Sequence, residues 1–266
     1  MSALGADLDH VAVAAERQAD LWPRYGGDLG GRWVGGGRSV GFASAQVRFT
    51  GGMKVEALEP CEPERNDFLR RFLDHSGPGP HHLTFKVPDI EAAIGAARAH
   101  GVDPVGIDLG DPGWKEAFLH PKAASGIVVQ MAQSAGDWDE EGRSPLPEPL
   151  VAEPAILLHI AHLVADLGAA RELFAGLLGG RDDEDGDSVL AWPGGGRLRL
   201  VSPEPGTAEA DELGARPGRL HHLAFAVLDP GRVPSAVSAG DGRFVVPPEA
   251  NHGTRLVLSE PGGPSI

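Results

Sequence analysis

One segment of the N-terminal half occurs again, little changed, in the C-terminal half. Residues 81–90 read His-His-Leu-Thr-Phe-Lys-Val-Pro-Asp-Ile, and residues 221–229 read His-His-Leu-Ala-Phe-Ala-Val-Leu-Asp. In both copies apolar residues alternate with a period of two, which is typical of a β-strand with one face in the core. Each strand is followed by an alanine-containing segment that favours a helix. A repeat on this scale predicts a chain built from similar supersecondary units.

The same order of elements, a strand, a helix and then further strands, can be followed four times. We expect the units to begin with strands at residues 8–14, 82–87 and 156–164 and at His222. Glycine and capping signals predict their helices at residues 16–25, 90–100, 166–178 and 231–239, with a connecting helix at 63–75. The fourth unit is expected to be one strand short, because the sequence stops soon after its strands at 244–246 and 254–258.

Four βαβββ-like units predict an α+β fold with two domains, at residues 4–133 and 155–266. Residues 134–154 between them contain acids, serine, glycine and proline without any periodicity, which indicates a linker. Within each domain we expect two units to form one curved, cup-shaped mixed sheet. Helices would cover its outer face, so that the polar face of the strands lines the cup.

Composition excludes several kinds of partner and site. The 266 residues carry a net charge of −15, which opposes binding to nucleic acids and to anionic membranes. A single cysteine, Cys61, excludes an intramolecular disulfide framework and cysteine-based zinc sites. There is no apolar run of ~20 residues and no signal-peptide pattern, so we expect a cytoplasmic protein.

Four polar side chains share the face of the predicted strands that lies opposite the core. His10 and Glu56 lie on the first and last strands of the first unit, and His82 and Gln130 occupy the matching strands of the second. If the two units form one curved sheet, these four side chains converge inside it. Two imidazoles, a carboxylate and an amide oxygen form a suitable ligand set for a divalent metal ion, with positions left for water or substrate.

These segments resemble the vicinal oxygen chelate superfamily, which includes glyoxalase I, methylmalonyl-CoA epimerase, extradiol dioxygenases and bleomycin-resistance proteins. The resemblance is strongest to the epimerase, within residues 8–132. It rests on Val-Glu-Ala-Leu-Glu-Pro at 55–60, His-His-Leu-Thr-Phe at 81–85, Phe-Leu-His-Pro-Lys at 118–122 and Gly-Ile-Val-Val-Gln at 126–130. It implies two glyoxalase-like domains and a divalent ion, such as Zn, Ni, Co, Mn or Fe. The ligands that it implies are the same four residues: His10, Glu56, His82 and Gln130.

The chain departs from the epimerase pattern at two places. The epimerase has a carboxylate where this sequence has Gln130, which cannot act as a base. The other catalytic carboxylate of that family would lie on the strand at residues 40–49, but no Asp or Glu occurs between Leu29 and Val55. An epimerisation that uses two acid–base groups therefore lacks its expected residues.

The C-terminal half departs further from the pattern. His159 and His222 occupy the positions of the two histidines, but Arg199 takes the place of the glutamate. The fourth position is either Val257 or has no counterpart. Because an arginine repels a cation, we expect this half to bind no metal.

Three classes of function follow from these residues. The first is a metal-dependent lyase or isomerase that acts on a small oxygen-chelating carbonyl substrate through a metal-stabilised enolate, with Glu56 as ligand and base. The second is a metal-free protein that binds a small molecule, as bleomycin-resistance proteins do. The third is an iron(II) dioxygenase with His10, His82 and Glu56 as its ligands. Each implies a small-molecule substrate or ligand and a monomer or homodimer, and the sequence identifies neither the substrate nor the metal.

Overall fold

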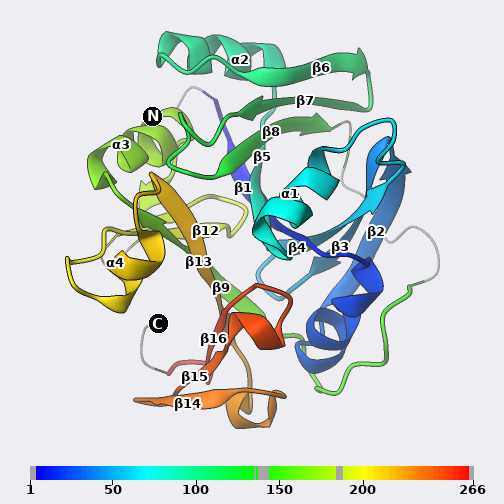
Figure 1. The fold of residues 1–266 in the computed structure, drawn as a ribbon, viewed down its shortest axis with the longest axis vertical. Helices are drawn as coiled ribbons and strands as arrows, with labels where there is room; N and C mark the ends of the chain where they lie inside the picture. The colour runs from blue at the N-terminus through cyan, green and yellow to red at the C-terminus, as the bar shows by residue number, and fades with distance from the viewer. Residues whose placement is uncertain (1–3, 135, 137–143, 184–187, 264–266) are drawn as a thin grey trace. The chain divides into compact units, whose positions relative to one another are not determined.

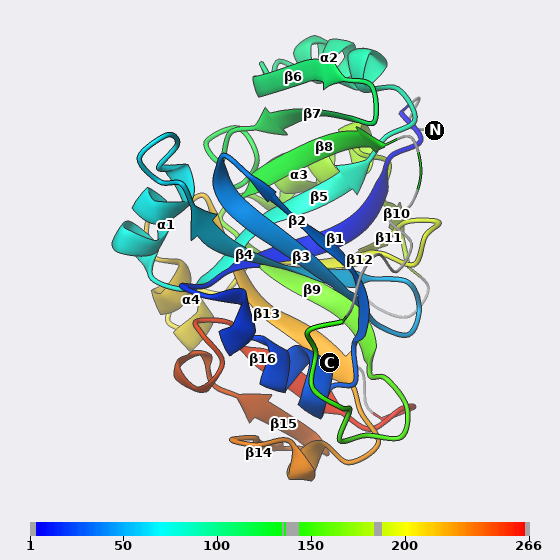
Figure 2. The same ribbon diagram turned by 90° about the vertical axis from the view of Figure 1, so that its right-hand side faces the viewer.

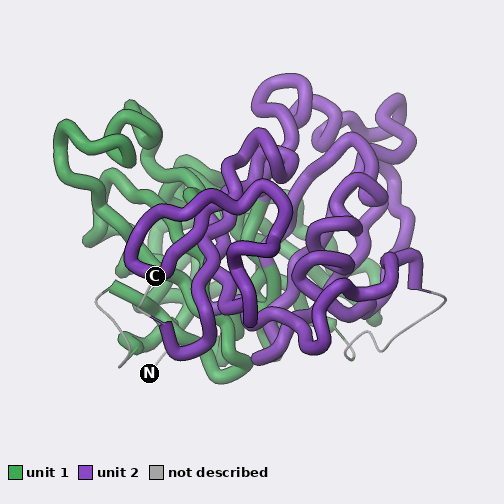
Figure 3. Tube along the Cα trace, turned by 90° about the horizontal axis from the view of Figure 1, so that it is seen from below, with its two compact units in different colours: residues 1–10, 82–137, 159–221 green, residues 11–81, 138–158, 222–266 purple. Residues whose placement is uncertain are grey.

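The computed structural model describes residues 4–134, 136, 144–183 and 188–263. Its tertiary contacts divide the chain into two compact units (Figure 3). Unit 1 comprises residues 1–10, 82–137 and 159–221, and unit 2 comprises residues 11–81, 138–158 and 222–266. Each unit therefore combines three segments, drawn from both halves of the chain. The domain boundaries that we expect from the sequence stay a prediction.

The first eight strands form a single curled mixed sheet (Figures 1 and 2). Its strand order is β2-β3-β4-β1-β5-β8-β7-β6. The outer strands pair antiparallel, whereas β5 and β8 pair parallel. The strands are β1 (Asp7–Ala14), β2 (Arg32–Ser39), β3 (Gly41–Arg48), β4 (Lys54–Cys61), β5 (Gly79–Lys86), β6 (Val105–Asp111), β7 (Trp114–Leu119) and β8 (Val128–Ser134).

The second eight strands repeat the same topology. Their order, β10-β11-β12-β9-β13-β16-β15-β14, matches that of the first sheet strand for strand. The strands are β9 (Ile156–Val164), β10 (Arg181–Asp182), β11 (Val189–Ala191), β12 (Arg197–Val201), β13 (Gly218–Ala226), β14 (Val237–Gly240), β15 (Arg243–Val246) and β16 (Leu256–Ser259). The predicted α+β class, with paired βαβββ units in two cup-shaped sheets, is confirmed.

The fourth unit differs from its prediction in two ways. It is not one strand short, because β14, β15 and β16 are all present. The helix predicted at residues 231–239 is wrong: a short 3₁₀ turn at Pro230–Arg232 is followed by β14. Pro234 explains the difference, since proline removes a backbone donor and clashes with the preceding turn of a helix. Residues beyond it pair with β15 instead.

The helices of the first half lie close to the predicted positions. The α2 helix (Ile90–Ala99) begins after Asp89, whose carboxylate accepts hydrogen bonds from two backbone N–H groups of the first turn. The helix α1 (Phe68–Ser76) takes the place of the predicted connecting helix. Where a helix was expected at 16–25, the chain forms a 3₁₀ turn at Gln18–Asp20 and a π-helical segment at Pro23–Asp28.

The described residues of the C-terminal half include two short α-helices, α3 (Leu167–Arg171) and α4 (Ala208–Leu213). A π-helical segment, Glu172–Leu177, continues α3, so that together they cover the helix predicted at 166–178. A further 3₁₀ turn lies at Pro248–Ala250. No helix within the described residues is long and apolar enough to cross a membrane.

The core of unit 2 covers part of the polar face of the first sheet. The helix α1 packs against β3 and β4, where apolar side chains form one buried cluster. The cluster comprises Ala12, Ala14, Leu58, Leu69 and Leu73, with Phe42, Phe68 and Phe72 packed against it. Leu58 is two residues beyond Glu56, on the same face of β4. The face that carries Glu56 is therefore covered by apolar side chains directly beside this residue.

The predicted linker is held in place where the structure describes it. Residues 144–155 form neither helix nor strand, while residues 135 and 137–143 lie outside the described residues. The backbone N–H of Leu150 donates to Gly27, and that of Ala155 donates to Leu29, both at 2.9 Å. These bonds tie the segment to the first βαβββ unit.

Candidate metal centre

Three of the four predicted ligands come together. The ligand atoms of His10, Glu56 and His82 all lie within 4.8 Å of one another. They come from β1, β4 and β5, which are neighbours in the order β4-β1-β5. The side chains are buried, with exposed fractions of 1%, 8% and 6%, although the sequence predicts them on an open face. A buried group of two imidazoles and one carboxylate is a candidate metal centre.

The ring of His10 is oriented by its neighbour in the sequence. Its Nδ1 lies 2.7 Å from a carboxylate oxygen of Asp9. Because a carboxylate accepts hydrogen bonds, this contact favours the tautomer with the proton on Nδ1 and the lone pair on Nε2. The ring centre lies 6.1 Å from that of His82, with an angle of 64° between the planes. Histidines that bind metals are commonly held by such a carboxylate.

Glu56 lies opposite an amide on the next strand. In the antiparallel ladder of β3 and β4, Gln46 is its direct partner, and Nε2 of Gln46 donates to Oε1 of Glu56 at 3.2 Å. A buried carboxylate needs donors or cations around it, because water no longer solvates the charge. One polar group is therefore placed to fix the orientation of this carboxylate.

His81, adjacent to the candidate centre, is half-buried and packs against aromatic side chains. Its ring packs edge-on against Phe72 and Phe68. Burial lowers the pKa of His81 to about 4, although the negative charge of Glu56 acts in the opposite direction. The ring is therefore neutral at pH 7, as expected for the core-facing histidine of the pair at 81–82.

Gln130, the fourth predicted ligand, lies on β8 and is hydrogen-bonded at both ends of its amide. It is the direct partner of Thr84 in the parallel ladder of β5 and β8, and Thr84 is two residues from His82. Oγ1 of Thr84 donates to Oε1 of Gln130 at 2.6 Å. Nε2 of Gln130 donates to a carboxylate oxygen of Glu116 at 2.7 Å. Both ends of the amide are thus hydrogen-bonded.

Glu116 is a residue that sequence reasoning missed. It lies on β7, half-buried, and accepts hydrogen bonds from Gln130 and from the indole N–H of Trp114, each at 2.7 Å. The signal was present: Ala117 and Leu119 face the core, so that Glu116 and Phe118 share the opposite face of the strand. The ladder places Phe118 beside Gln130, and Glu116 next to it on that face.

The register of the second sheet decides between the two alternatives for the fourth position there. Ala224 pairs with Val257, just as Thr84 pairs with Gln130, so Val257 is the counterpart of Gln130. His159 is buried, and both this burial and the positive charges of Arg199 and Arg197 lower its pKa to about 4. An arginine beside this histidine opposes cation binding. The absence of a metal from this half stays a prediction.

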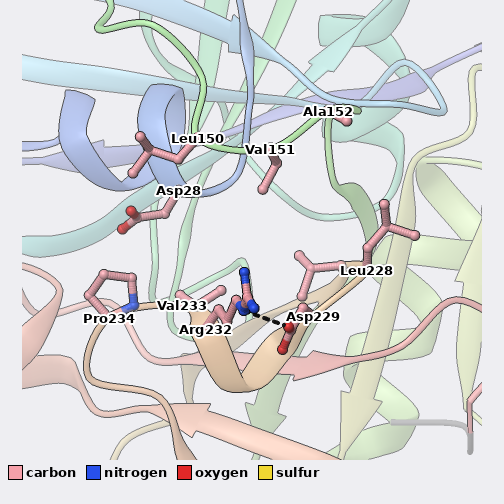
Figure 4. A pocket seen from close by; sticks show the side chains of 10 residues that line it. Asp28, Leu150, Val151, Ala152, Leu228, Asp229, Arg232, Val233 and Pro234 are labelled. Atoms are coloured by element: carbon pink, nitrogen blue, oxygen red, sulfur yellow. Dashed lines mark ion pairs between the residues drawn. The ribbon is translucent and has the colours of Figure 1, made fainter.

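A pocket of about 370 Å³ lies in unit 2, and none of the predicted ligands lines it (Figure 4). Most of its wall is apolar. It is lined by Asp28, Leu150, Val151, Ala152, Val227, Leu228, Asp229, Arg232, Val233 and Pro234. Arg232 and Asp229 form an exposed ion pair at 3.0 Å, and the carboxylate of Asp28 is bound by Arg24 at 2.7 Å. The charged groups of the pocket are therefore already paired within the protein.

Comparisons with known proteins agree with the fold. Residues 9–118 match the family model of the Glyoxalase/Bleomycin resistance protein/Dioxygenase superfamily. The uncharacterized protein YqjC of Bacillus subtilis (strain 168) is 27% identical over 138 residues, which cover 50% of this chain and 96% of that protein. Similar solved structures include the hypothetical protein BH1468 from Bacillus halodurans C-125, with 28% identity and a TM-score of 0.45. The match covers 50% of this chain and 96% of that protein.

A second similar structure is the methylmalonyl-CoA epimerase from Mycobacterium tuberculosis. It is 26% identical with a TM-score of 0.46, and the match covers 51% of this chain and 92% of that protein. Each of these relatives corresponds to about half of the present chain. The resemblance predicted from the motifs of residues 8–132 is confirmed. The similarity to the Glyoxalase/Bleomycin resistance protein/Dioxygenase superfamily covers residues 9–118 of this chain.

Proposed function

We propose that this protein is a metal-dependent enzyme of the lyase or isomerase type, acting on a small carbonyl compound that carries two neighbouring oxygen atoms. The observation that carries the proposal is the buried group of His10, Glu56 and His82. Two histidines and a glutamate are a ligand set of catalytic zinc sites, which keep a position for water or substrate. The superfamily match of residues 9–118 supports the same reading.

The spacing of the three side chains fits a single ion. Ligand atoms at ~2.1 Å from a tetrahedral ion lie roughly 3.4 Å from one another. The observed limit of 4.8 Å therefore requires only small side-chain movements. A divalent ion bound there would act as a Lewis acid toward the oxygen atoms of the substrate. The three ligands contribute one negative charge, so the ion would keep part of its positive charge for the substrate.

The residues of the chain have distinct roles in this proposal. His10, oriented by Asp9, and His82 would hold the ion. Glu56 would be the third ligand and the base that accepts the proton from the carbon next to the carbonyl group. Gln46, which donates to Oε1, keeps the carboxylate in a fixed orientation. The buried surroundings exclude water, which strengthens each of these electrostatic contacts.

The proposal is tested by proton exchange in deuterated water. Protein loaded with Zn²⁺, Ni²⁺, Co²⁺ or Mn²⁺ is incubated with a panel of small α-hydroxycarbonyl and α-dicarbonyl compounds, and loss of the α-proton is followed by NMR. We expect exchange with at least one compound, reduced by roughly 10²-fold or more in the Glu56→Gln variant, because one acid–base group is lost. Exchange that is equal in both proteins, or absent from the whole panel, contradicts the proposal.

The same ligand set favours one further candidate function. Two histidines and one carboxylate also bind Fe(II) in non-haem oxygenases. An iron(II) dioxygenase is therefore the second candidate, again with His10, His82 and Glu56 as ligands. Oxygen consumption by protein loaded anaerobically with Fe(II), in the presence of a catechol, separates the two. An isomerase or lyase consumes no oxygen, whereas a dioxygenase consumes one O₂ per substrate.

A further inference from the structure

A line of hydrogen bonds crosses three neighbouring strands of unit 1. Thr84 on β5 donates to Gln130 on β8, at 2.6 Å. Gln130 donates to Glu116 on β7, and the indole of Trp114 donates to the same carboxylate oxygen, both at 2.7 Å. The ladders β5·β8 and β8·β7 fix the spacing of these side chains. The network is therefore part of the rigid sheet rather than of a loop.

The chemistry of the three partners decides which way the amide of Gln130 points. An ionised carboxylate only accepts hydrogen bonds, so the end of Gln130 that faces Glu116 must be its NH₂ group. The carbonyl oxygen then faces Thr84. A hydroxyl can either donate or accept, and Thr84 alone would therefore allow both orientations of the amide. Glu116 is the partner that selects one of them.

The selected orientation matters for the candidate metal centre. Thr84 lies two residues from His82 on the same face of β5, so the amide oxygen points toward the strand that carries this ligand. A carbonyl oxygen has two lone pairs, of which Thr84 engages one, and the other is suited to a cation. With the amide reversed, its NH₂ group would face that strand and repel a cation.

We propose that Glu116 is a positioning residue that makes Gln130 an oxygen ligand for the ion held by His10, Glu56 and His82. The inference rests on the proposed function, because it requires that an ion binds there. A carboxylate at residue 130 would bind the ion directly. Here the carboxylate of Glu116 on β7 instead orients the amide of Gln130 by a hydrogen bond, so that the amide oxygen faces the ion.

Metal affinity tests this role without any assay of activity. The protein is titrated with Zn²⁺ by calorimetry as wild type, Glu116→Leu, Gln130→Ala and the double variant. We expect Glu116→Leu, which removes the acceptor, to weaken binding about tenfold or more, the usual scale for losing a residue that orients a metal ligand. In the Gln130→Ala background the same change should have no further effect, because the amide that it orients is gone.

Two controls separate this effect from a general loss of structure. Thr84→Val removes the other hydrogen bond to the amide but leaves Glu116 to select the orientation, so it should change the affinity less than threefold. Glu91→Gln alters an exposed glutamate on α2 and should change nothing. Thermal melts of all variants report folding. If Glu116→Leu does not fold, Glu116→Asp, which keeps an acceptor-only side chain, should fold and bind more tightly than Glu116→Ala.

The outcomes distinguish this inference from the proposed function. Wild-type affinity in Glu116→Leu, or an equal loss from Glu116→Leu with and without Gln130, overturns the positioning role while the metal centre stands. If the wild-type chain takes up no Zn²⁺, the metal centre itself is refuted and the inference with it.

Discussion

Replacement of Asp9 tests whether the buried histidines are arranged to bind an ion. Asp9 accepts a short hydrogen bond, 2.7 Å long, from Nδ1 of His10, and its own side chain is 14% exposed, so the charge is largely shielded from solvent. The bond orients the ring and increases the basicity of Nε2. Loss of such a partner usually weakens metal binding by roughly 10–100-fold, which corresponds to about 1.4–2.7 kcal/mol. Asparagine can still accept through its amide oxygen, so we expect Asp9→Asn to fall near tenfold and Asp9→Ala nearer to a hundredfold.

A competition titration of Zn²⁺ against a chelating dye measures this loss directly. Asp74→Asn is a matched control, because Asp74 is also an aspartate in an ion pair, with Arg70 at 2.8 Å, but its side chain is 64% exposed. Its replacement should leave the affinity unchanged, since exposed ion pairs contribute little and lie away from the ligands. If Asp9→Asn and Asp9→Ala both bind Zn²⁺ as tightly as the wild type, His10 is not a metal ligand held by Asp9, and the reasoning fails.

Three further predictions follow from the structure. Burial lowers the pKa of His162 from its ordinary 6.5 to about 4, so between these values the unfolded chain binds a proton that the folded chain does not. The free energy of unfolding should therefore increase as the pH rises from about 4 to 6.5. His162→Phe should reduce this slope by about 1.4 kcal/mol per pH unit in urea titrations at several pH values, and an unchanged slope would refute the prediction. A Cβ atom at Gly218 would lie 1.9 Å from the carbonyl oxygen of Ser125, so Gly218→Ala should destabilise the protein by about 1–3 kcal/mol in chemical unfolding, and an unchanged midpoint would contradict that contact. Exchange of the α-proton of methylmalonyl-CoA should be at least ~10²-fold slower than in a competent two-base epimerase. The exchange rate should rise in the Gln130→Glu variant. Rapid exchange by the wild type would contradict this prediction and would mean that a carboxylate such as Glu116 acts as the base.

The alternation of apolar residues predicted most of the fold, because a strand with one face in the core must place every second residue there. Together with the repeat, it predicted the units, their order and four candidate ligands on one face, three of which lie together in the structure. The pattern could not show how deeply that face is buried. The apolar cluster under α1 covers it, and this contact joins segments that are far apart in the sequence.

The errors have equally local causes. The helix predicted at 231–239 rested on composition, whereas Pro234 and pairing with β15 determine the strand that forms there. Glu116 was not among the predicted site residues, because the strand pattern predicts ligands on the first and last strands of each unit and β7 lies between them in the sequence. Only the ladder of β7 with β8 shows that its carboxylate reaches Gln130.

Metal content is the most direct test of the central claim, that the first sheet holds a single metal centre. The chain is purified without chelator, exposed to Zn²⁺, freed of excess metal and measured by mass spectrometry, beside the variants His82→Ala and His222→Ala. We predict one ion per chain in the wild type, its loss in His82→Ala and its retention in His222→Ala, since the counterpart of Glu56 in the second sheet is Arg199. No ion in the wild type, or an equal loss from both substitutions, would contradict the account.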